Sequence, residues 1–152
     1  MTRPDPATLT AWRSLLEAHR GATTALDEEL RAAHDLPLEW YDVLFQLHEH
    51  GGRLRMGDLA DRLLVSRSNC TRLVDRMDRA GLVAREDDPG DRRGRLAVLT
   101  PAGRRRFRRA APTHLAGIAR HIGAPLAAIG TAPDILGRAL GAIAAAAATR
   151  DD

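Results

Sequence analysis

The 152-residue sequence contains no lysine and only one cysteine. A single cysteine excludes an internal disulfide and a cysteine-based zinc site, and it fits a reducing cytoplasm. The longest apolar run, 142–148, is far too short to span a bilayer, and the polar N-terminal residues show no signal-peptide pattern. We therefore expect a cytoplasmic protein that does not enter a membrane.

The patterns typical of an enzyme are also missing. There is no glycine-rich phosphate loop and no constellation of nucleophile and base. His48 and His50 do not share a helical face, and no cluster of cysteines or histidines accompanies them. We expect no catalytic residue, no cofactor and no metal site.

Positive charge is concentrated in the middle of the chain. Residues 53–109 hold 16 arginines and eight acidic residues, whereas the rest of the chain holds seven arginines and 12 acidic residues. A local basic region is the electrostatic signature of a polyanion partner. A solvated arginine-rich surface would have the same composition, so charge alone leaves both readings open.

Apolar spacing and turn residues predict a mainly helical chain with a small sheet. Gly81 is suited to ending a helix, and the Asp-, Pro- and Gly-rich segment 87–91 predicts a turn between two strands. Pro112 is predicted to kink or restart the long helix that follows Thr100-Pro101. The predicted elements are helices over 8–33 and 37–50, a strand over 53–56, helices over 57–64 and 66–80, strands over 82–86 and 95–99, and helices over 101–123 and 132–149.

The helix over 66–80 has one apolar face and one polar face. Its apolar residues, Cys70, Leu73, Val74 and Met77, recur at helical spacing, which favours packing over redox sensing for Cys70. The polar face carries arginine, asparagine, serine and threonine, which suit hydrogen bonding to base edges. The predicted DNA contacts on this helix are Ser66, Arg67, Ser68, Asn69, Thr71 and Arg72, with Arg76 better placed for a phosphate.

An ordinary amphipathic helix would carry a similar polar face. The short helix before it, the tight Val65-Ser66 turn and the strand-turn-strand after it favour a winged helix-turn-helix. Arg92 and Arg93 lie on the predicted wing, where an arginine can enter an A·T-rich minor groove. A polar hairpin with a local Asp–Arg pair is the alternative, and the two readings are compatible.

Six segments together resemble the MarR family (multiple antibiotic resistance regulators) over roughly Leu36 to Leu115. They are Leu36–Leu44, Leu59–Leu63, Ser66–Met77, Gly81–Val83, Asp91–Gly94 and Leu99–Gly103. The resemblance implies a mainly α (α+β) fold, with a winged helix-turn-helix DNA-binding domain over 36–109. Long N- and C-terminal helices, 1–35 and 110–152, would form a dimerisation region.

The resemblance also implies how such a protein works. A homodimer would bind double-stranded DNA at a pseudo-palindromic operator, as a repressor that a small aromatic, phenolic or anionic effector releases. Asp75 would pair with a wing arginine, here Arg93, with Asp91 in the same brace, and Arg92 would enter the minor groove. The effector would meet residues of the first two helices and the long helix, namely Trp12, His19, Trp40 and His114.

Two alternatives remain from the sequence. The tryptophans and histidines assigned to the effector can instead pack the core or a dimer interface. The whole chain can instead be a winged-helix dimerisation module that binds protein partners and no DNA. Such a module would not need arginines on its wing or a polar N-terminal half in the helix over 66–80.

Overall fold

The computed structural model describes residues 3–148, apart from the side chains of Arg92, Arg93 and Ala148. It divides into two units, one formed by the described residues of 1–25 and 115–152 and the other by residues 26–114. The elements are α1 (Pro6–His34), α2 (Leu38–Glu49), β1 (Arg53–Arg55), α3 (Met56–Leu63), α4 (Arg67–Arg79), β2 (Val83–Asp88), β3 (Asp91–Leu99), α5 (Pro101–Ile118), the π-helical turn η1 (Ala119–Gly123), α6 (Ala124–Ala128) and α7 (Pro133–Ala148).

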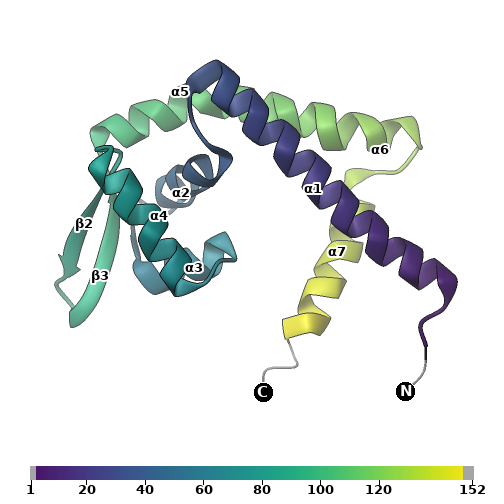
Figure 1. Ribbon diagram of the computed structural model, residues 1–152, viewed down its shortest axis with the longest axis horizontal. Helices are drawn as coiled ribbons and strands as arrows, with labels where there is room; N and C mark the ends of the chain where they lie inside the picture. The colour runs from purple at the N-terminus through teal and green to yellow at the C-terminus, as the bar shows by residue number, and fades with distance from the viewer. Residues whose placement is uncertain (1–2, 149–152) are drawn as a thin grey trace. The chain divides into compact units, whose positions relative to one another are not determined.

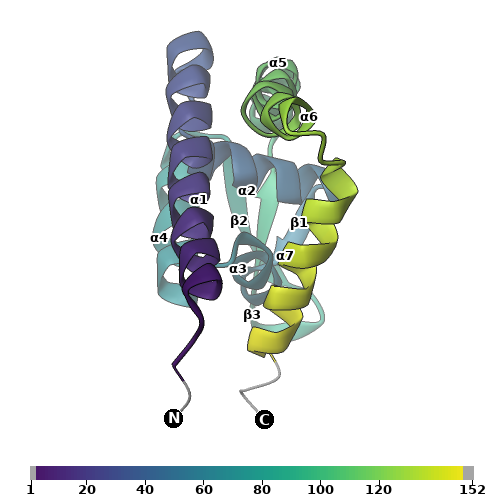
Figure 2. The same ribbon diagram turned by 90° about the vertical axis from the view of Figure 1, so that its right-hand side faces the viewer.

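The sheet is small and antiparallel, with strand order β1-β3-β2. Leu54 lies opposite Ala97, and Ala84 lies opposite Val98. The β2–β3 hairpin extends beside α4, and α2 and α3 pack against the strands (Figures 1 and 2). The predicted mainly α fold with a winged helix-turn-helix is therefore confirmed.

One continuous core holds the larger unit together. Apolar side chains from α1 to α5 meet there, and most are completely buried, as expected for faces with helical or alternating spacing. The largest fully buried side chains are Leu30, Leu36, Leu44, Leu47, Leu59 and Met77. This core fixes α4 by its inner face and leaves its outer face to solvent.

Two sequence predictions about element boundaries were wrong. The predicted turn over 87–91 is shorter, because β2 continues to Asp88 and β3 begins at Asp91, which leaves only Pro89 and Gly90 between them. The helix does not restart at Pro112, because α5 runs from Pro101 to Ile118 with Pro112 inside it. The irregularity comes later, at η1. Thr149, the predicted end of the last helix, lies outside the described residues.

Asp42 on α2 carries a carboxyl group that the fold partly removes from water. Burial raises its pKa to about 6, and burial, together with the charge of Asp42, raises the pKa of Tyr41 to about 12. The folded state therefore prefers the neutral form of Asp42. The contribution of this group to the free energy of unfolding is complete below about pH 4 and is lost as the pH rises through 6.

We therefore expect Asp42→Asn to raise the free energy of unfolding at pH 7.5 by about 1–2 kcal/mol. The gain is smaller than for a fully enclosed carboxyl because Asp42 keeps some contact with solvent. Denaturant melts of both proteins between pH 4 and pH 8 measure it. The two curves should converge at the acidic end, and an exposed control, Asp61→Asn, should run parallel to the wild type. A gain that is constant across the pH range would contradict this origin.

Candidate nucleic-acid interface

Local signals in the sequence begin and end α4. Leu64 adopts a left-handed conformation (φ 57°) that closes α3. Ser66 then caps α4, and its hydroxyl oxygen accepts a hydrogen bond from the Asn69 backbone N–H at 3.2 Å. At the other end Gly81 has φ 72°, a conformation that costs glycine little. The helix is thus closed at both ends as the sequence predicted.

The inner face of α4 is apolar and fully covered. Cys70, Val74 and Met77 have no exposed surface, and Leu73 is nearly buried. Burial raises the pKa of the Cys70 thiol, so the reactive thiolate is disfavoured. These observations support the packing role predicted for Cys70.

The outer face of α4 presents the predicted polar residues, with differing freedom. Arg67, Ser68, Asn69 and Arg72 are exposed. Thr71 is half-buried, and its hydroxyl donates to the Arg67 carbonyl oxygen at 3.0 Å. Its hydroxyl is thereby engaged within the helix, and that of Ser66 is engaged in the cap. The exposed polar side chains of this face include Arg67, Asn69 and Arg72.

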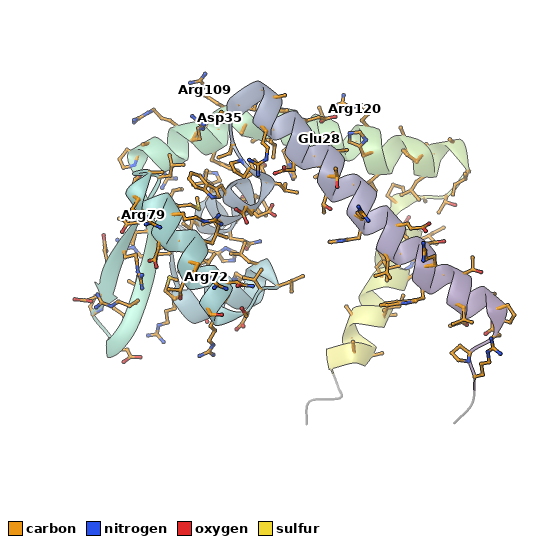
Figure 3. The ribbon with its side chains drawn as sticks, viewed as in Figure 1. Glu28, Asp35, Arg72, Arg79, Arg109 and Arg120 are labelled. Atoms are coloured by element: carbon orange, nitrogen blue, oxygen red, sulfur yellow. The ribbon has the colours of Figure 1, made fainter. Side chains whose placement is uncertain are left out.

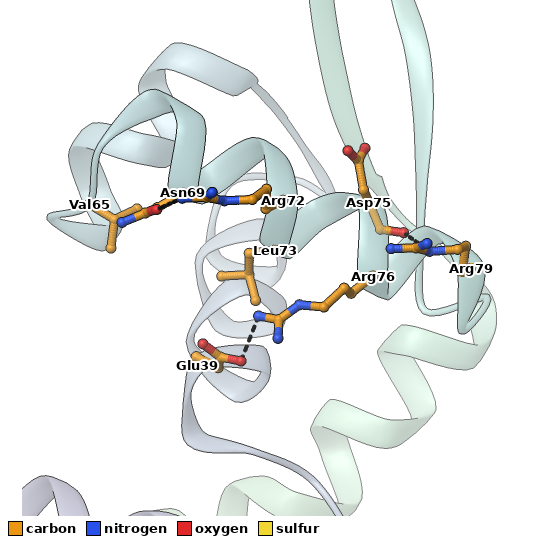
Figure 4. Close-up of a pocket in the computed structure, with 8 residues that line it drawn as sticks. All are labelled: Glu39, Val65, Asn69, Arg72, Leu73, Asp75, Arg76 and Arg79. Carbon is orange, nitrogen blue, oxygen red and sulfur yellow. Dashed lines mark hydrogen bonds and ion pairs between the residues drawn. The ribbon is translucent and has the colours of Figure 1, made fainter.

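A hollow of about 500 Å³ lies between this outer face and the start of α2. Figure 4 shows how its polar side chains are paired. Arg72 Nη2 donates to Asn69 Oδ1, Arg76 Nη2 donates to Glu39 Oε1 at 2.8 Å, and Arg79 Nε donates to the Asp75 carbonyl oxygen at 3.2 Å. Figure 3 shows Arg72 and Arg79 projecting from the same helix. The hollow is lined by Glu39, Val65, Asn69, Arg72, Leu73, Asp75, Arg76 and Arg79.

A second hollow, of about 410 Å³, lies on the wing side of α4. It is also rich in arginine, so basic side chains flank α4 on both sides. A groove with this charge suits the phosphates that border a major groove. Its lining is Arg55, Met56, Gly57, Asp58, Arg67, Thr71, Arg85, Asp91, Gly94 and Arg95.

Among the described side chains, three acid–arginine pairs stabilise the wing. Asp75 on α4 pairs with Arg85 on β2, and Asp87 pairs with Arg95 across the hairpin. The third carboxylate, Asp88, is only 9% exposed. Its Oδ2 lies 2.7 Å from Arg55 Nε on β1, and its Oδ1 accepts from the Gly90 backbone N–H at 2.9 Å. These ion pairs connect the hairpin to β1 and to α4.

Asp75 has a partner, Arg85, that the sequence did not suggest. The physical reason is that β2 packs against α4, which places Arg85 beside Asp75. Arg85 follows the buried Val83 by two residues, so strand alternation puts both side chains on the same face. That alternation is the signal by which the sequence could have indicated the pair. The side chains of Arg92 and Arg93 lie outside the described residues, and Asp91 is exposed at the start of β3.

The four predicted effector residues are divided between the two units of the structure. Trp12 and His19 are exposed in the smaller unit, whereas Trp40 and His114 belong to the larger one. Trp40 lines a hollow of about 410 Å³ with Arg31, Asp35, Pro37, Ala80, Leu82 and Arg106. His114 is not part of that lining.

His114 packs on Tyr41, with ring centroids 4.2 Å apart, and burial lowers its pKa. The geometry of this histidine is that of a packing residue. Among the described residues, no cluster of three histidine, cysteine or acidic side chains could hold a metal ion. No single helix among them is long and apolar enough to cross a bilayer, although the helices of 101–128 and 133–147 meet that test as a sharply bent pair.

Solved structures share this fold. AbsC from Streptomyces coelicolor, a MarR family transcriptional regulator, is 34% identical, with a TM-score of 0.84 and 100% of both chains covered. The chain belongs to the MarR family. The model of that family matches residues 34–94, from the end of α1 to the wing. A MarR family protein is a transcriptional regulator, which agrees with the prediction that the chain is no enzyme.

Two further relatives of this MarR protein bear on its role. Sco3205 from Streptomyces coelicolor, solved in complex with DNA, is 32% identical, with a TM-score of 0.81 and coverage of 96% of this chain and 92% of that chain. BadR from Rhodopseudomonas palustris, a transcriptional activatory protein, is 51% identical over 51 residues, which are 34% of this chain and 29% of BadR. The chain spans about half or less of the curated relatives it matches.

Proposed function

We propose that this MarR family protein is a sequence-specific double-stranded DNA-binding repressor that acts as a homodimer on a pseudo-palindromic operator. The observation that carries the proposal is the outer face of α4. Its N-terminal half presents exposed Arg67, Asn69 and Arg72, while its inner face is locked in the core. Such side chains read base edges when a helix enters the major groove. The DNA complex of Sco3205, at 32% identity, supports the same role.

The smaller unit supports the homodimer. Its described helices leave many large apolar side chains in contact with water, which is costly for an isolated chain and typical of a surface that another subunit covers. Trp12 is 59% exposed and Leu115 is 62% exposed. Further exposed apolar residues of this unit are Leu9, Leu16, Ile118, Ile122, Ile129, Ile135, Leu140 and Ile143.

The wing would add a contact outside the major groove. We expect Arg92→Ala to weaken binding to any duplex and to reduce the slope of log affinity against log salt by about 1 per protomer, since one phosphate or minor-groove contact is lost. Mobility-shift titrations at several salt concentrations measure the slope. Arg108→Ala, which removes an exposed arginine from α5, is the control of equal charge. An unchanged slope for Arg92→Ala would mean that Arg92 does not contact the DNA.

An effector that releases the protein from DNA is part of the proposed function. A small aromatic anion would find an indole and two guanidinium groups in the hollow that Trp40 shares with Arg31 and Arg106. Arginine and a flat aromatic ring are complementary to a ligand that is both anionic and planar. Repeating the DNA-binding assay with a panel of aromatic acids tests this part of the proposal separately.

Footprinting over the promoter region next to the gene tests the central function. We expect protection of two half-sites about one helical turn apart, as a two-fold symmetric dimer requires. Transcription from the protected promoter, with and without the protein, gives the sign of regulation. Protection nowhere, on this region or on a random-sequence pool, would favour the dimerisation module that binds no DNA.

A further inference from the structure

A glutamate on a neighbouring helix binds one arginine of the recognition helix. Glu39 stands in the first turn of α2, and its Oε1 accepts from Arg76 Nη2 at 2.8 Å (Figure 4). The two side chains are 50% and 51% exposed, so the pair is open to solvent. A phosphate oxygen could therefore approach the same guanidinium group.

We propose that Glu39 competes with DNA phosphates for Arg76 and so weakens the sequence-independent part of DNA binding. Carboxylate and phosphate oxygens are equivalent acceptors for a guanidinium group. While Glu39 pairs with Arg76, the pair carries no net charge, so a phosphate is attracted to Arg76 less strongly than it would be without the carboxylate. The inference rests on the proposed DNA-binding function and adds a residue of α2 to the interface.

The pairing within the hollow makes Arg76 the specific target of this competition. Of the three arginines that line it, Arg72 donates to the neutral amide oxygen of Asn69, and Arg79 donates to a backbone carbonyl oxygen. Among the carboxylates that the structure describes, one pairs with a guanidinium group of these three, and that group belongs to Arg76. Removing the charge of Glu39 should therefore act through Arg76 and leave the base-reading end of α4 unchanged.

A double-mutant cycle tests the competition directly. Wild type, Glu39→Gln, Arg76→Gln and the double variant are titrated by fluorescence anisotropy against two duplexes at several salt concentrations. One duplex carries the site found by footprinting, and the other has a mixed sequence of the same length. We expect Glu39→Gln to tighten binding to both duplexes by about two- to fivefold per protomer, because an exposed ion pair has little strength. Its salt slope should steepen by about 1 per protomer.

The Arg76→Gln background and the Glu49→Gln control show whether the gain from Glu39→Gln depends on Arg76. In the Arg76→Gln background the gain from Glu39→Gln should disappear. Glu49→Gln removes the same charge from an exposed position at the other end of α2 and should leave affinity nearly unchanged. Glu39→Ala repeats the test with a different side chain, and a thermal melt confirms that each variant folds.

Three results would overturn the inference. Weaker binding by Glu39→Gln would make Glu39 a residue that positions Arg76 for DNA. An equal gain in the Arg76→Gln background, or with Glu49→Gln, would reveal a general charge effect. No change in the presence of measurable wild-type binding would mean that Arg76 stays away from phosphates. Absence of wild-type binding to either duplex, by contrast, would refute the proposed function itself.

Discussion

Replacing Gly103 by alanine is expected to lower the free energy of unfolding by about 2–3 kcal/mol. Gly103 is buried in the first turn of α5, and an added Cβ would lie 2.0 Å from the Leu82 carbonyl oxygen and 2.9 Å from Leu99 Cδ1. The carbonyl oxygen cannot easily retreat, because it accepts from both the backbone N–H and the hydroxyl group of Thr100. Accommodation requires α5 to move away from the start of the wing.

The same substitution elsewhere in the chain provides the control. Gly137 lies inside α7, and a Cβ added there meets nothing within 4 Å. Gly137→Ala should raise helix stability by up to about 1 kcal/mol, because alanine is the better helix former. Denaturant midpoints at one fixed protein concentration compare the two variants with the wild type. A Gly103→Ala protein as stable as the wild type would show that the first turn of α5 does not pack against Leu82.

Arg72→Ala is expected to weaken binding to the operator by about 1–3 kcal/mol per half-site and to relax sequence preference at one base position. Arg72 lies one turn beyond the N-terminus of α4, and its guanidinium group is held by Asn69 Oδ1 on the outer face. An arginine fixed in this way loses less conformational entropy when it donates to a base. Competition binding with a library randomised at each operator position measures both effects.

Comparing the operator with mixed-sequence DNA distinguishes a base contact of Arg72 from a phosphate contact. Loss of a base contact should affect the operator far more than a mixed-sequence duplex, whereas loss of a phosphate contact should affect both equally. Arg108→Ala removes the same charge from α5 and should reduce neither the affinity nor the preference substantially. Equal losses for Arg72→Ala on both duplexes would assign Arg72 to the phosphate backbone.

Local signals predicted most of the fold. The spacing of apolar residues located α4 and its buried face, and Ser66 and Gly81 located its ends, because caps and helical periodicity act over a few residues. Segment 87–91 was less predictable. Its Asp and Gly residues are typical of turns, but Asp87 and Asp88 lie in β2, where Arg95 and Arg55 pair with them. Pairing with β3 extends the strand through Asp88 despite the local preference.

Side-chain pairing between elements was the harder part of the site. The polar face of α4 follows from its sequence, but the choice of Arg85 as the partner of Asp75 depends on how β2 packs against the helix. The contact between Glu39 and Arg76 joins residues 37 positions apart, and no local pattern indicates it. Predicting such pairs requires the three-dimensional arrangement of α2, α4 and the wing.

The buried thiol of Cys70 gives the protein an internal reporter of helix detachment. It is the only cysteine in the chain and has no exposed surface beneath the recognition helix. A thiol reagent can therefore react only when α4 separates from the core, and the labelling rate then follows the free energy of that opening. Comparing the labelling rate of the free protein with the rate in the presence of operator DNA would show how strongly the DNA restrains α4.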